Sequence, residues 1–174
     1  KEEKFIDQVY YVNLGVSFNK KKVFNYFEKK NIFPSFPSKK KFLFIPIIID
    51  EKRKDLLIFS DNKIFKKWNE TIESFNLLEY ILPTEDLEDF NIIKKKYDFI
   101  EEYDFKEVTD KYNLRNSIIA LIFKNDQGVR VLSRIKSNND VILKNQSFKN
   151  ISIDNDDQIT DLIKNLKVIY EDYW

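Results

Sequence analysis

The 174-residue sequence predicts an α/β fold, an α+β sandwich in which helices pack on one mixed β-sheet. Three observations predict this class. Strand-like and helical hydrophobic patterns alternate along the first two thirds of the chain, and the apolar run at 42–49 has the composition of a strand buried on both faces. Three further strand-like segments, separated by polar turns at 124–128 and 137–140, predict a C-terminal antiparallel three-strand meander.

Each element follows from its own pattern of apolar and polar residues. In chain order the sequence predicts a strand at 9–18, a helix at 19–31, a loop at 32–40, a strand at 41–50, a short strand or helix lead-in at 55–60, a helix at 61–77, a strand at 78–84, helices at 86–95 and 104–113, strands at 117–123, 129–135 and 140–148, and a helix at about 156–173.

Local signals support several of these assignments. Asn19 and Asp61 are residue types that cap helices, and each precedes a stripe of apolar residues at helical spacing. Two prolines exclude a helix or a central strand from the 32–40 loop. Because proline has no N–H to donate, Pro46 indicates a bulge or a locally unpaired position inside the 41–50 strand.

The composition excludes several chemistries. The chain has no Cys and no His, so disulfides, thiol nucleophiles, Ser–His–Asp triads and zinc sites built on imidazole or thiolate are impossible. Thirty basic residues oppose 29 acidic ones, which predicts no binding of nucleic acid. The longest apolar run is too short for a membrane span, and no glycine-rich phosphate loop exists. We therefore expect no cofactor and assign no catalytic or metal-binding residues.

The segment ILPTEDLEDF at 81–90 carries four clustered carboxylates, which are Glu85, Asp86, Glu88 and Asp89. Asp86 stands where a helix N-cap is expected, and Asp89 follows three residues later, as in a capping box. Negative charge in a first turn also suits the helix dipole. We interpret the cluster as the start of a helix. The alternative is a metal or acid–base site, which requires carboxylates to converge from several elements.

The loop FPSFPS at 33–38 is the candidate binding surface. Phe33 and Phe36 would form an apolar patch that Pro34 and Pro37 stiffen. In the alternative interpretation, both rings fold over the edge of the sheet and cap the core. Trp68 lies on the apolar stripe of its predicted helix, which predicts a core position.

Six segments taken in order resemble an uncharacterised proteobacterial family, domain of unknown function 2066; they are FLFIPIIID, DNKIFKKWNE, LEYILPTEDLEDF, VTDKYN, SIIALI and IYEDYW. The resemblance spans nearly the whole chain, and its most specific pieces are the Trp68 helix, the LPTEDLED step and the Tyr112 helix. It implies an exported α/β domain of the periplasm or cell envelope, with no assigned catalytic residues. The length of the chain predicts one domain over 1–174, with a weak internal division as the alternative. The resemblance implies that this domain lacks an N-terminal α/β segment that full-length relatives carry.

The order of elements is also similar to small periplasmic accessory domains, which is an analogy of fold alone. These observations predict a non-enzymatic accessory module that binds another envelope protein through the 33–38 loop and the nearby strand end. One alternative is a hydrolase whose divalent cation is held by Asp86 and Asp89, with Asp50 or Glu51. Another is a structural domain within a larger envelope assembly.

Overall fold

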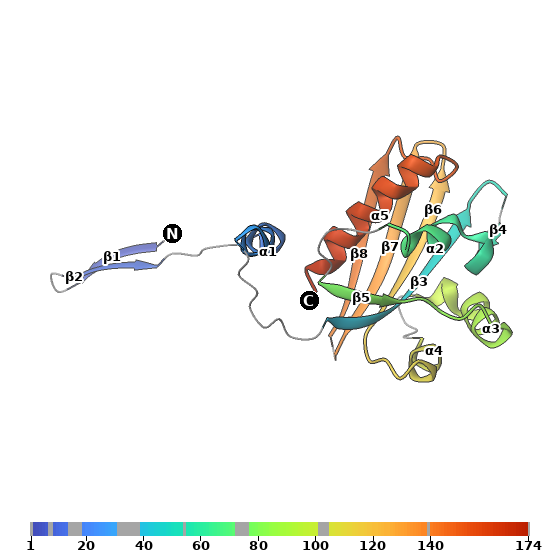
Figure 1. Cartoon of the computed structure of the whole chain (residues 1–174), viewed down its shortest axis with the longest axis horizontal. Helices are drawn as coiled ribbons and strands as arrows, with labels where there is room; N and C mark the ends of the chain where they lie inside the picture. Colours follow the sequence, from blue (N-terminus) through green and yellow to red (C-terminus); the bar gives the residue numbers. More distant parts are fainter. Residues whose placement is uncertain are drawn as a thin grey trace. The chain divides into compact units, whose positions relative to one another are not determined.

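The computed structural model describes residues 2–6, 9–13, 19–30, 39–53, 55–71, 77–100, 105–138 and 140–173. The chain divides into two compact units, Lys1–Pro37 and Ser38–Trp174 (Figure 1). Each unit is described by itself, and the single domain over 1–174 stays a prediction.

The first unit contains a hairpin and a helix. Strand β1 (Glu2–Ile6) pairs antiparallel with β2 (Val9–Asn13). Helix α1 (Lys20–Lys29) begins after Asn19, whose side-chain oxygen accepts the backbone N–H of Lys22 at 3.0 Å. The predicted cap at Asn19 is therefore confirmed.

The second unit is built on a mixed six-stranded sheet (Figure 1). Its strands are β3 (Lys40–Asp50), β4 (Asp55–Leu57), β5 (Leu78–Ile81), β6 (Ser117–Asn125), β7 (Gly128–Ser137) and β8 (Asp140–Lys149). The order is β4-β3-β6-β7-β8, with β5 also paired to β3. β3 runs parallel to β5 and β6, whereas β6, β7 and β8 are successively antiparallel. The predicted fold class and the C-terminal meander are confirmed.

Helices cover both faces of this sheet. They are α2 (Lys63–Trp68), α3 (Leu87–Lys96), α4 (Lys106–Lys111) and α5 (Asp156–Glu171), with 3₁₀ turns η1 (Phe59–Asp61) and η2 (Tyr97–Phe99). One hydrophobic core joins α2 and α5 to the first face, and a second joins α3 and α4 to the other. The sheet is thus the middle layer between two sets of helices, as in α/β sandwiches.

Strand β3 is buried on both faces, as its unbroken apolar run predicts. Phe44 points into the core of α2 and α5, and its neighbour Ile45 points into the other core. Trp68 of α2 is fully buried and stacks on Phe44, with ring centroids 3.8 Å apart. The predicted core position of Trp68 is confirmed.

Pro46 lies in a gap along one edge of β3. On that edge β5 pairs with residues 40–43 and β4 with residues 48–50, which leaves Pro46 between them. The Pro46 carbonyl accepts a hydrogen bond at 2.9 Å from the side chain of Asn62. Because the N and the carbonyl of one strand residue face the same edge, the missing N–H of Pro46 costs no ladder bond to β6. The predicted locally unpaired position is confirmed.

Asn62 also begins α2. Its side-chain oxygen accepts the backbone N–H groups of Ile64 at 2.9 Å and Phe65 at 3.1 Å, so the predicted cap at Asp61 is wrong. Both residue types cap helices well, but the amide has N–H donors that a carboxylate lacks. The amide therefore binds the Pro46 carbonyl and caps the helix at once. The helix is also shorter than predicted, ending at Trp68, and residues 72–76 lie outside the described part.

Candidate functional site: the edge strand β8

The loop predicted to bind a partner lies outside the described residues. Phe33, Pro34, Phe36 and Pro37 all fall within 31–38. Their role therefore stays a prediction.

The acidic segment starts α3, as the sequence predicts. The Asp86 carboxylate accepts the backbone N–H of Asp89 at 2.9 Å, which is the expected N-cap bond. This bond is the largest influence on the Asp86 pKa, which it and the ammonium group of Lys111 lower from 3.8 to about 2. Glu85 and Glu88 are exposed.

Asp89 does not complete a capping box. Its carboxylate is fully buried and accepts hydrogen bonds from the Tyr112 hydroxyl and, at 3.1 Å, from the Lys111 ammonium. Lys111 also binds Asp86 and, at 3.5 Å, Glu88, so three carboxylates share one cation. Burial and the bond to Asp89 raise the Tyr112 pKa. The network joins α3 to the end of α4, and Lys111 is the cation that its carboxylates share.

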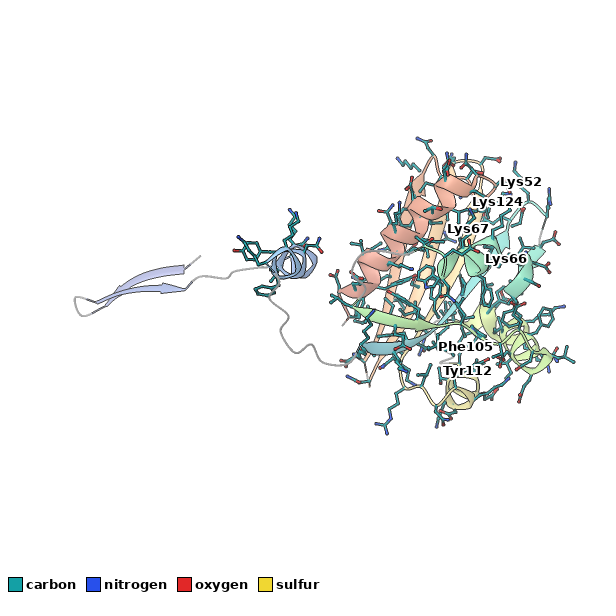
Figure 2. All side chains as sticks on the ribbon, in the orientation of Figure 1. Lys52, Lys66, Lys67, Phe105, Tyr112 and Lys124 are labelled. Atoms are coloured by element: carbon teal, nitrogen blue, oxygen red, sulfur yellow. The ribbon has the colours of Figure 1, made fainter. Side chains whose placement is uncertain are left out.

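The proposed cation site does not assemble among the described residues. Asp89 is bound to Tyr112, whereas Asp50 forms ion pairs with Arg53 and Lys124. Tyr112 and Lys124 lie in separate parts of the second unit (Figure 2). Within the described ranges, no group of three or more His, Cys, Asp or Glu is placed to hold a metal ion.

A charged cavity of about 240 Å³ lies where β3 and β6 end. Lys124 of β6, opposite Asp50 in the parallel register, sits between Asp50 at 3.8 Å and Asp154 at 2.8 Å. The backbone N–H of Arg53 is the largest influence lowering the Asp50 pKa. Asp61 and Lys63 complete the charged lining, so three acidic and three basic side chains face one another. Lys124 bridges Asp50 and Asp154, so part of the charge in the lining is paired within the protein.

Strand β8 is the long outer strand of the sheet (Figure 1). It has ten residues, whereas β4 and β5 on the opposite edge have three and four. No described strand of the second unit pairs with its outer side. Its first half carries three consecutive exposed apolar residues: Val141 is 45% exposed, Ile142 38% and Leu143 44%. An outer strand with an unoccupied edge and exposed apolar side chains is a template for pairing with another strand.

The apolar triplet, Val141–Leu143, covers both faces of the β8 edge. Ile142 is opposite Ile135, which belongs to the core of α2 and α5, so Ile142 lies on that face. Val141 and Leu143 therefore point to the other face. The sequence contains a signal for this exposed triplet, because three apolar residues in a row break the alternation of a half-buried strand. The sequence does not show that this strand is the outermost one, so the triplet could not be recognised as exposed.

Comparison with known proteins gives no match: no family model, no curated protein and no solved structure resembles the chain significantly. Among the helices that the structure describes, none combines the length and the apolar character needed to cross a membrane.

Proposed function

We propose that this protein is a non-enzymatic accessory module that binds an extended segment of another protein chain along β8. One observation carries the proposal: a ten-residue outer strand that exposes Val141, Ile142 and Leu143 on its two faces. In strand addition, main-chain hydrogen bonds supply affinity and alternate side chains supply specificity. In support of the proposal, no described strand of the second unit occupies the outer edge of β8, and its first half exposes apolar side chains on both faces.

The charges of β8 support selective binding. Lys144 and Lys149 are exposed on the same strand. Charged side chains on an edge oppose indiscriminate pairing between strands, because each must find an acceptable neighbour in the partner. A partner segment must therefore match an apolar stretch that is followed by a positive charge.

The cellular location of the proposal is the bacterial periplasm or envelope. It is supported by the sequence resemblance described above. Fractionation of cells expressing the natural gene tests it: we expect the protein in the periplasmic or envelope fraction, and recovery in the cytoplasm would contradict this part.

Site-specific photo-cross-linking in cells tests the binding surface. A photoreactive amino acid replaces Ile142 in one variant and Leu87 in the control; Leu87 lies on α3 and is 75% exposed. We expect position 142 to cross-link to an extended segment of a defined protein, identified by mass spectrometry, and position 87 not to. Equal labelling from both positions, or none from 142, would overturn the proposal.

A further inference from the structure

We propose that the chain taken up by β8 is a second copy of this protein, paired antiparallel about a two-fold axis at Ile142. This inference rests on the proposed function, because it uses β8 as the binding edge. It adds the identity and register of the partner. The observation behind it is that the exposed part of β8 is complementary to itself.

The faces of the strand restrict the possible registers. Directly opposite residues of an antiparallel pair point to the same face. Ile142 shares its face with α5, so its opposite residue in the second copy must share that face too. In every allowed two-fold register, one residue of β8 is therefore directly opposite the same residue of the second copy, and the axis lies between these two residues.

The apolar triplet selects one of these registers. With the axis at Ile142, Ile142 faces its own copy and Val141 faces Leu143, so all three apolar residues meet apolar partners. Every other two-fold register within β8 places at least one of the three opposite a polar residue or leaves it unpaired. An axis at Lys144 would also place two like charges directly opposite each other, which is destabilising.

The charges flanking the triplet agree with the same register. Asp140 precedes the triplet and Lys144 follows it, and both are exposed. About an axis at Ile142, each Asp140 is opposite the Lys144 of the other copy. The apolar pairs are thus flanked on each side by a pair of opposite charges, Asp140 of one copy and Lys144 of the other. The result is one sheet continuing across two copies, with both α5 helices on the same face.

Cysteine cross-linking tests the register directly, since the chain has no Cys of its own. In Ile142→Cys the two introduced residues would be opposite each other, within the Cα separations that disulfides span. In the matched control Asn145→Cys they would be six residues apart along the strands, or ~20 Å. We expect a covalent dimer from Ile142→Cys and not from Asn145→Cys under the same mild oxidation. No dimer from Ile142→Cys, or equal dimer from both, would overturn the register.

A charge-complementation experiment separates loss of pairing from misfolding. Ile142→Lys and Ile142→Glu each place like charges opposite each other, so each variant alone should be monomeric by sedimentation velocity at a concentration where the parent is dimeric. An equimolar mixture should dimerise again, which two misfolded variants would not do. Leu87→Glu, a change on exposed α3, should leave the parental dimer unchanged. Failure of the mixture to dimerise would overturn the inference.

The oligomeric state of the parent protein, together with cross-linking from position 142, tells failure of this inference apart from failure of the proposed function. If it is monomeric across a dilution series and Ile142→Cys forms no covalent dimer, the second copy is overturned as the partner. The binding function then stands if photo-cross-linking from position 142 captures a different protein. It falls as well if position 142 captures nothing.

Discussion

Replacing Asn62 with alanine should destabilise the second unit more than removal of an ordinary helix cap. The Asn62 side chain is fully buried and makes two kinds of contact. Losing the cap bonds to Ile64 and Phe65 should cost about 1 kcal/mol. Losing the donor to the buried Pro46 carbonyl should cost roughly 1–3 kcal/mol more, because that oxygen is left without its partner. We therefore expect Asn62→Ala to lower the free energy of unfolding by roughly 2–4 kcal/mol in urea denaturation.

The chain offers a matched control in Asn155, which caps α5. Its side-chain oxygen accepts the backbone N–H groups of Asp157 at 3.0 Å and Gln158 at 3.2 Å, and the residue is exposed. Asn155→Ala should cost the cap alone, about 0.5–2 kcal/mol. The difference between the two variants measures what the buried amide adds to the cap, chiefly its bond to the Pro46 carbonyl. If Asn62→Ala costs no more than Asn155→Ala, the reasoning about the unpaired edge of β3 is refuted.

Three further predictions concern acid stability, a turn and the core. The folded pKa of Asp86, about 2, lies below the usual 3.8, so its stabilising contribution is complete above pH 3.8 and is lost as pH falls towards 2. Acid titration of Asp86→Asn should therefore show a smaller loss of stability over this window than the parent. Gly128→Ala should lower the unfolding free energy by more than ~1 kcal/mol, because φ is +141° and a Cβ would lie 2.2 Å from the Phe148 carbonyl oxygen; an unchanged melting temperature would contradict this. Tyr170→Phe should cost roughly 1–3 kcal/mol in urea denaturation, because the buried Ser133 hydroxyl, 2.7 Å away, would lose its partner. Adding Ser133→Ala should recover part of that loss.

Elements whose signals are local could be predicted from the sequence. The buried run of β3, the turns of the meander and the caps at Asn19 and Asp86 each depend on residues close together in the chain. Such patterns state which faces are apolar and where the chain turns. These local patterns were enough to predict the fold class and to predict that the acidic segment begins a helix.

Features decided by distant partners could not be predicted in the same way. Asp61 and Asn62 are adjacent cap residues of similar quality, and the choice between them depends on the Pro46 carbonyl across the sheet edge. Asp89 fits a capping box locally, but Tyr112 from another helix binds its carboxylate. The binding edge depends on strand order, because the pattern of β8 predicts a strand without saying which strand lies outermost.

The parallel pairing of β3 with β6 has a consequence for how the protein reaches its native state. The chain between these two strands forms β4, α2, β5, α3 and α4, whereas β6, β7 and β8 are joined by tight turns. Closing a long loop costs more entropy than closing a short one, and topologies rich in distant contacts fold slowly. We therefore expect the meander to form early and the insertion of β3 to limit the rate. Until β3 docks, the inner side of β6 is a second unpaired edge, so nascent chains would expose two competing surfaces for association.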